Sequence, residues 1–174
     1  MNPTPLSYTI TDTVIGTIVL VGSERGLRET HWVRDAAEGK RWVSERYPTA
    51  LEVPGFFQTT IEAIRDYLAG KGPLEVPFDL VGGTPLQRMV WIAISRIPYG
   101  ETVSYTALAG RVGFPSAIRA VASACGANPL PLVIPCHRVI AKDGTLGGFS
   151  MGGLEIKEKL LGMEKNAEPI ALVA

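Results

Sequence analysis

The fold of the second half of this chain is decided by residues 104–129, SYTALAGRVGFPSAIRAVASACGANP. Ser104 and Ser116 are each placed to cap a helix, and Gly113-Phe114-Pro115 forms a tight turn between the two helices. The first helix is expected to reach Val112, and the second covers 117–127 and ends at Asn128-Pro129. Two short helices joined by a glycine-containing turn are typical of a helix-turn-helix.

The segments around this motif are mostly helical in pattern. Thr84, Pro85 and Gln87 form the signature of a capping box, and apolar residues follow at helical spacing as far as Ile97. After the motif, residues 139–146 with the turn Lys142-Asp143-Gly144 predict a hairpin or wing. Residues 154–164 predict a final helix.

The first half of the chain has a different pattern. Residues 7–21 alternate and are β-branched, which predicts a hairpin broken near Asp12 or Gly16, and 27–33 predict a further strand. Helices are expected over 35–47 and 57–68, followed by an extended link over 74–80. The sequence therefore predicts an N-terminal α/β domain (1–80) and a mostly helical C-terminal domain (81–174). The first half shows no catalytic constellation, and His31-Trp32 is interpreted as a structural pair.

Composition limits the classes of function. With 174 residues and 46% hydrophobic content, the chain can bury a sizeable core. No apolar run approaches the ~20 residues of a membrane span, and only two cysteines point to a reducing, cytoplasmic setting. A zinc site of Cys and His would need all four such residues without any CxxC-type pair, so no metal is expected. Before residue 84 the chain carries 8 Lys/Arg and 11 Asp/Glu, whereas residues 84–165 carry 9 and 5, so a polyanion would meet the second half.

The candidate nucleophile lies in Ile134-Pro135-Cys136-His137-Arg138-Val139. A thiol beside an imidazole is the minimum equipment for a thiolate nucleophile, and the apolar flanks suggest a shaped, partly buried place. Glu164 falls on or beside the apolar face of the final helix, where a buried carboxylate would need a partner. His137 is the natural one; the alternative is a helix-end glutamate that reaches solvent.

Arg119 breaks a local rule, because a cation in the first helical turn opposes the helix dipole at a cost of roughly 0.3–1 kcal/mol. Its helix is otherwise built from small side chains such as Ala117, Ala120 and Ser123, which allow close approach to another surface. That surface is either the protein's own core or a narrow groove of a partner. A glycine-rich loop around Phe149-Ser150 can also bring backbone N–H groups close to a flat ligand.

Together these residues resemble the O6-alkylguanine-DNA alkyltransferase family, also called methylated-DNA–protein-cysteine methyltransferases. The resemblance is carried in order by Arg119-Ala120-Val121, Asn128-Pro129, Pro135-Cys136-His137-Arg138-Val139, Gly148-Phe149-Ser150 and Leu160-Leu161…Glu164. It covers about 84–165 in detail, and the first half only in outline. It implies an RNase H-like N-terminal domain and a winged helix-turn-helix.

The resemblance also implies the roles of the site residues. Cys136 accepts the alkyl group, Glu164 orients His137, and His137 takes the thiol proton through a water. Tyr105 donates a proton to the leaving guanine, and Asn128 braces the helix-turn-helix against the cysteine loop. Arg119, Ala117, Ala120 and Ser123 contact DNA, while Val139, Phe149 and Ser150 form the base pocket. Arg138 is expected to be a structural ion-pairing residue.

The implied function is direct-reversal repair: one alkyl group moves irreversibly from O6-alkylguanine, and possibly O4-alkylthymine, in duplex DNA to Cys136. The implied partner is double-stranded DNA bound at its minor groove by a monomer, with no cofactor and no membrane. The alternatives are an alkyltransferase-like protein that binds the lesion without transfer, and a cysteine hydrolase, for which no separate histidine or oxyanion hole is located. The Phe149 loop is one residue longer than the common family form, which bears on pocket size.

Overall fold

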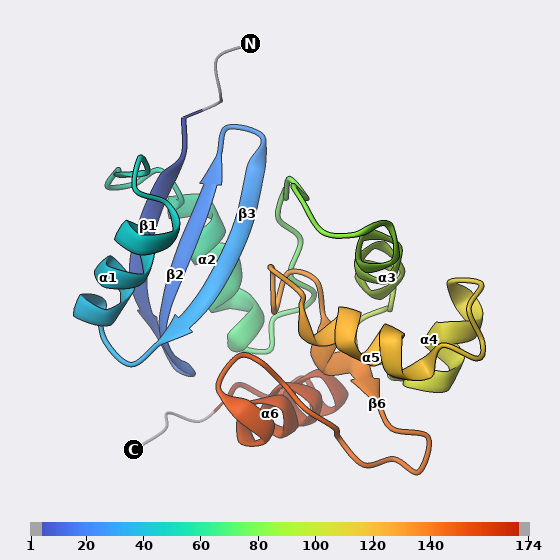
Figure 1. Ribbon diagram of the computed structural model, residues 1–174. Coiled ribbons are helices and arrows are strands. Elements are labelled where there is room, and N and C mark those ends of the chain that lie inside the picture. The colour runs from blue at the N-terminus through green and yellow to red at the C-terminus, as the bar shows by residue number, and fades with distance from the viewer. Residues whose placement is uncertain (1–4, 171–174) are drawn as a thin grey trace.

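The computed structural model describes residues 5–170 and begins with a mixed four-stranded sheet (Figure 1). The strands are β1 (Ser7–Thr13), β2 (Gly16–Ser23), β3 (Gly26–Val33) and β4 (Leu51–Glu52), in the order β3-β2-β1-β4. The pairs β1–β2 and β2–β3 are antiparallel, and the short β4 runs parallel to β1. The predicted hairpin and the third strand are confirmed, whereas β4 was not foreseen.

Two helices cover opposite faces of this sheet. Helix α1 (Ala36–Arg46) begins at Asp35, whose side chain accepts a hydrogen bond from the Glu38 N–H. It packs on the face that carries Val19, Val21 and Val33. Helix α2 (Gln58–Leu68) lies against the other face with Ile61 and Ile64 (Figure 1). Successive side chains of β2 point to opposite faces of the sheet and nearly all are buried, so both faces are apolar.

The second half begins with α3 (Pro85–Ser95), which has the predicted capping box between Thr84 and Gln87. Helix α4 (Tyr105–Arg111) is capped by Ser104 as expected. Helix α5 (Ile118–Gly126) begins one residue later than predicted, and its N-cap is Ala117 without a side-chain hydrogen bond. The expected Ser116 cap is therefore wrong, because the turn that ends at Ala117 is closed by its own N–H donating to the Phe114 carbonyl.

The chain after α5 leads to a one-turn 3₁₀ helix, Cys136–Arg138, and then to β6 (Val139–Ile140). Strand β6 pairs in parallel with β5 (Val103–Ser104). The turn near Asp143 is present, but no returning strand follows it, so the predicted hairpin is not formed among the described residues. Helix α6 (Gly153–Asn166) is slightly longer than predicted.

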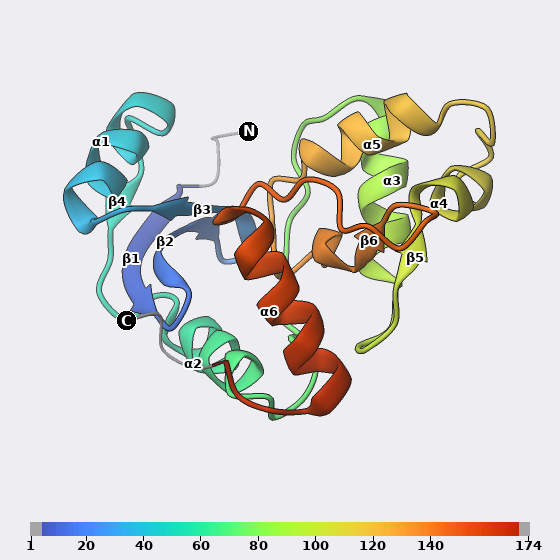
Figure 2. The same ribbon diagram turned by 90° about the horizontal axis from the view of Figure 1, so that it is seen from below.

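Helix α6 runs between the sheet with α2 on one side and α3, α4 and α5 on the other (Figure 2). One hydrophobic core joins Leu20 and Ile64 from the first half to Ile94, Val121 and Leu160 from the second. The architecture is thus an α/β unit joined to a mostly helical unit, and six α-helices occur within residues 5–170. Each helix within residues 5–170 is too short or too polar to span a lipid bilayer.

Candidate active site

The loop that leads to Cys136 is held by the side chain of Asn128, the residue expected to brace this loop. Asn128 Nδ2 donates to the Ile134 carbonyl at 2.8 Å, and its Oδ1 accepts the Leu130 N–H at 3.0 Å. These two hydrogen bonds fix a loop in which Leu132 adopts a left-handed φ of 74°, a strained conformation for a branched side chain. Cys136 follows this loop and is 5% exposed.

The expected pair of Glu164 and His137 is present and lies in a larger buried network. Glu164 Oε1 is 2.8 Å from His137 Nε2 and accepts the Tyr67 hydroxyl at 2.7 Å. The Arg138 guanidinium donates to both oxygens of Glu164, with its Nη2 2.9 Å from Oε1 and its Nε 2.9 Å from Oε2. The Gly100 N–H also donates to Oε2, at 3.1 Å. The alternative of a solvent-facing Glu164 is excluded.

This network fixes the tautomer of His137. The bond to ionised Glu164 requires a proton on Nε2, so the lone pair lies on Nδ1. Nδ1 is buried and has no hydrogen-bond partner within residues 5–170. Burial lowers the pKa of His137, and Glu164 partly opposes that effect. Burial would raise the pKa of Glu164, but hydrogen bonds from His137, Arg138 and Tyr67 hold it well below its ordinary value. The resting site therefore has a neutral imidazole beside a carboxylate.

Burial raises the pKa of the Cys136 thiol, although Asn128 and the Lys157 ammonium act in the opposite direction. The thiol is consequently protonated at neutral pH, and a thiolate forms only if a base takes its proton. The candidate base is Nδ1 of His137, the next residue in the sequence, because this nitrogen carries the free lone pair.

A cavity of about 350 Å³ opens onto the Cys136 thiol. Its lining comes from α4, α5, the 3₁₀ helix and the glycine-rich loop: Tyr105, Ala122, Cys125, Gly126, Cys136, Gly147, Gly148, Phe149 and Ser150. Gly147 has a φ of 65°, and a Cβ atom there would lie 3.1 Å from the Tyr105 hydroxyl. Burial, with smaller effects from Cys125 and Cys136, raises the pKa of Tyr105 to about 12, so this hydroxyl keeps its proton at neutral pH.

Lys157 holds one wall of this cavity in place. Its side chain is fully buried, and Nζ donates to the carbonyls of Val139 at 2.7 Å, Leu146, and Gly148 at 3.4 Å. Val139 is itself buried and does not line the cavity. Its carbonyl already accepts Lys157, which leaves one lone pair for a ligand.

The residues predicted to contact DNA lie on α5 and its N-cap. Arg119, Ala120 and Ser123 are exposed, and Ala117 is half-buried. The opposite face packs Val121 and Ala124 into the core, and the Trp91 indole donates to the Ala124 carbonyl at 2.8 Å. One face of α5 therefore packs on the protein's own core, and the face with Ala120 and Ser123 is exposed.

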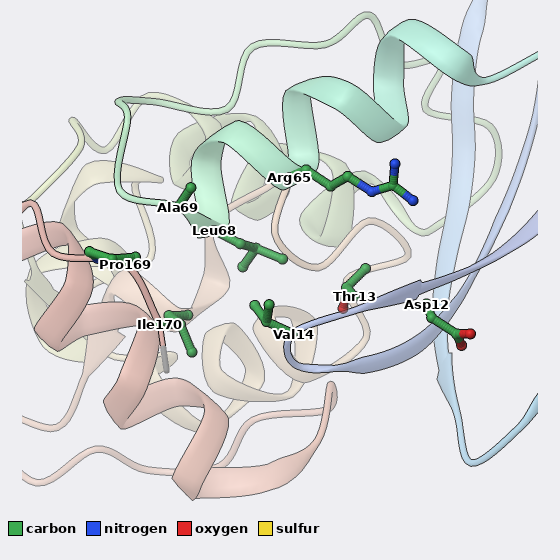
Figure 3. A pocket seen from close by; sticks show the side chains of 8 residues that line it. All are labelled: Asp12, Thr13, Val14, Arg65, Leu68, Ala69, Pro169 and Ile170. Carbon is green, nitrogen blue, oxygen red and sulfur yellow. The ribbon is translucent and has the colours of Figure 1, made fainter. Parts of the chain in front are cut away.

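A second cavity of similar volume shares no lining residue with the first and lies between the β1–β2 turn, the end of α2 and the segment after α6 (Figure 3). Val14, Leu68 and Ile170 face it, and its lining contains no nucleophile paired with a base. Across residues 5–170, no three His, Cys, Asp or Glu side chains are grouped so that they could hold a metal ion. His31 stacks on Trp42, with ring centroids 4.4 Å apart, and takes no part in the site.

Two residues of the site, Tyr67 and Lys157, were not predicted from the sequence. Tyr67 comes from α2 in the half where no catalytic constellation was expected, and only the fold brings it to Glu164. Lys157 carried a readable signal, because it precedes Glu164 by seven residues and so shares its face of the final helix. A lysine on a buried helical face needs acceptors for its three donors.

Comparison with known proteins adds independent evidence. Residues 85–166 match the family described as "6-O-methylguanine DNA methyltransferase, DNA binding domain". The chain is 42% identical, over 91% of its length and 97% of the relative's, to the methylated-DNA–protein-cysteine methyltransferase of Methanosarcina barkeri. It is 40% identical to the bifunctional transcriptional activator/DNA repair enzyme Ada of Escherichia coli, but spans only 46% of that protein.

A solved structure extends the likeness to three dimensions. The crystal structure of Mycobacterium tuberculosis OGT in complex with DNA superposes with a TM-score of 0.82 at 36% identity, over 94% of this chain and 95% of that one. Sequence and fold therefore agree over nearly the whole chain. The chain belongs to the methylated-DNA–protein-cysteine methyltransferase family.

Proposed function

We propose that this protein repairs DNA by direct reversal, moving one alkyl group from O6-alkylguanine in duplex DNA to the sulfur of Cys136. The observation that carries the proposal is the placement of the buried residue Cys136. It lines a cavity together with Tyr105, and the next residue, His137, is hydrogen-bonded to Glu164. O4-alkylthymine is a second candidate substrate, because the same displacement at an exocyclic oxygen would serve.

The chemistry follows from the protonation states at the site. Nδ1 of His137 takes the Cys136 proton through a water, and Glu164 stabilises the imidazolium that results. The thiolate attacks the alkyl carbon, so an S–C bond forms as the C–O6 bond breaks. Tyr105 donates its proton to the departing guanine, which leaves as a neutral base. The imidazolium proton then returns to the tyrosinate, and the product is a thioether that no residue of the site can reverse.

DNA recognition is assigned to α5 as the second helix of a winged helix-turn-helix. The exposed face with Ala120 and Ser123 carries small side chains that suit the narrow minor groove. Arg119 is exposed at the start of the helix, where it can occupy the space of the nucleotide that rotates out of the stack. Ala117, at the N-cap, borders the same surface.

The flipped base would enter the cavity beside Cys136. The carbonyls of Cys136 and Val139 and the Ser150 N–H are the groups proposed to read it. The Phe149 ring would contact the flat face of the flipped base. Its centroid lies 6.1 Å from that of the His137 ring, and the two ring planes are inclined by 79°. We also propose that residues 1–80 form an RNase H-like domain and residues 81–174 the alkyltransferase domain. The protein is proposed to be monomeric and cytoplasmic.

The test is incubation with duplex DNA that carries a single O6-methylguanine, followed by mass spectrometry. One added methyl on Cys136, in a one-to-one burst without turnover, is expected. Cys136→Ala should bind the same DNA without transfer. Full transfer by that variant, or binding by the unaltered chain with no methylated cysteine, would reject the proposal, and the second result would favour the lesion-binding alternative.

A further inference from the structure

We propose that Tyr67, a residue of α2 in the N-terminal half, is a positioning residue of the transfer reaction: its hydroxyl holds Glu164 and His137 in their reactive arrangement. The inference rests on the proposed function and extends it, because it makes the α/β half of the molecule a contributor to the chemistry at Cys136.

The Tyr67 hydroxyl contacts both members of the relay formed by Glu164 and His137. It donates to Glu164 Oε1 at 2.7 Å, and its oxygen is 3.1 Å from His137 Nε2. The side chain is 1% exposed, and its ring packs edge-on against Tyr99 with centroids 6.3 Å apart. A tyrosine has two side-chain torsions, and both are fixed here by packing, so the hydroxyl is a rigid donor.

The hydroxyl also decides how the charge of Glu164 is shared. Oε1 accepts bonds from Tyr67, His137 and Arg138, whereas Oε2 is held by Arg138 and the Gly100 N–H. Removal of the Tyr67 donor leaves Glu164 with an ion pair and a backbone donor, so the carboxylate stays ionised. Oε1 then interacts more strongly with His137. The Glu164 side chain is also no longer held by a residue of α2.

Two effects on His137 follow from this sharing. A less constrained Glu164 orients the imidazole less well, which slows proton removal from Cys136. A more strongly interacting carboxylate favours the imidazolium, so the resting imidazole becomes protonated at higher pH. The other charged or titratable groups near His137 are Arg138, Lys157 and Cys136, and none of them changes in this comparison.

Tyr67→Phe is the direct test, because it removes only the hydroxyl and keeps the packed ring. Its matched control is Tyr47→Phe, which removes a tyrosine hydroxyl that also bonds a carboxylate, Glu29, but lies outside the site. Single-turnover methyl transfer is measured from pH 5 to 9, together with affinity for undamaged duplex and unfolding in urea. Heteronuclear NMR of ¹⁵N-histidine-labelled protein, which contains only His31 and His137, follows the tautomer and titration of His137.

The expected result is an about tenfold slower transfer at neutral pH for Tyr67→Phe, which corresponds to ~1.4 kcal/mol in activation free energy. The acid limb of the rate profile and the His137 titration should both move to higher pH, while DNA affinity stays unchanged. Tyr47→Phe should match the unaltered protein in rate and pH profile.

Three outcomes would overturn the assignment. The first is an unchanged rate and pH profile. The second is a slower rate with an unshifted profile and weakened DNA binding, which would indicate only a structural role. The third is an unshifted His137 titration. If the unaltered protein transfers no methyl group, the proposed function fails, whereas the NMR titration still decides the role of Tyr67 in the relay.

Discussion

Replacing Lys157 with methionine tests how the wall of the cysteine cavity is held. Methionine keeps most of the apolar stem but removes the ammonium that bonds the carbonyls of Val139, Leu146 and Gly148. These carbonyls belong to β6 and to the loop that carries Phe149 and Ser150. Lys157→Met should therefore release the loop while the fold persists.

The magnitude follows from the contacts. Two close carbonyls lose a charged donor, at about 1–3 kcal/mol for each group left unsatisfied. The half-buried Leu146 segment can turn its carbonyl to water, and the protein no longer has to desolvate an ammonium. The net loss in the free energy of unfolding is then roughly 1–3 kcal/mol, which is less than the 5–15 kcal/mol stability of a typical domain.

Hydrogen exchange by mass spectrometry measures the release directly. Amides of residues 141–150 should lose protection in Lys157→Met, and methyl transfer should slow because Ser150 no longer faces the base. The control is Lys159→Met, two residues along α6, where the side chain is 32% exposed and pairs with the exposed Glu155. Such a surface pair is worth at most ~1 kcal/mol, so the control should change neither measurement. Native-like protection of the loop together with an unchanged transfer rate in Lys157→Met would refute the reasoning.

Three further substitutions separate binding, chemistry and stability. Arg119→Ala should leave the free energy of unfolding unchanged or raise it by about 0.3–1 kcal/mol, since an exposed cation leaves a helix N-terminus, while transfer from duplex DNA slows; a parallel loss of stability by urea unfolding would contradict this. Tyr105→Phe should slow single-turnover transfer by about 10²-fold without changing affinity for duplex DNA, and a loss confined to affinity would exclude its role as the acid. Glu164→Gln tests how stability depends on pH. The pKa of Glu164 is depressed in the folded protein, so ionised Glu164 stabilises the fold fully above the unfolded pKa of about 4.3, and this contribution is lost as the pH falls below that value. Urea unfolding at pH 7 and pH 3 should show a stability deficit of the variant that shrinks with acid, and a deficit independent of pH would refute this origin.

Much of this structure could be predicted from local sequence. The capping box at Thr84, the strands before residue 34 and the apolar face of α6 are set by neighbours a few residues apart, and they lie where expected. Glu164 was placed on the buried face by helical period alone, and its partner followed because His137 is one of only two histidines.

What could not be predicted depends on contacts between distant segments. Tyr67 and Glu164 are 97 residues apart, and no periodicity relates them. The segment after β6 had the turn residues of a hairpin, but Val139 found its partner in Val103 instead, as a parallel neighbour. The Ser116 cap was wrong because a backbone hydrogen bond from Ala117 closed the preceding turn.

The burial of Cys136 has a consequence for selectivity among electrophiles. A surface cysteine reacts with any soluble alkylating agent in proportion to its thiolate content. In this protein the raised pKa of Cys136 keeps the sulfur protonated, and the Asn128 hydrogen bonds and the surrounding core leave it 5% exposed. Random encounters in solution therefore rarely modify it.

The proposed single-turnover reaction depends on this low resting reactivity. If Cys136 were as nucleophilic at rest as an open thiolate, small electrophiles would inactivate the protein before it met a lesion. In the proposed reaction, an unreactive thiol with His137 as its base would react only while an alkyl carbon is held against the sulfur. The same burial that slows the free thiol thus preserves the unmodified protein for its substrate.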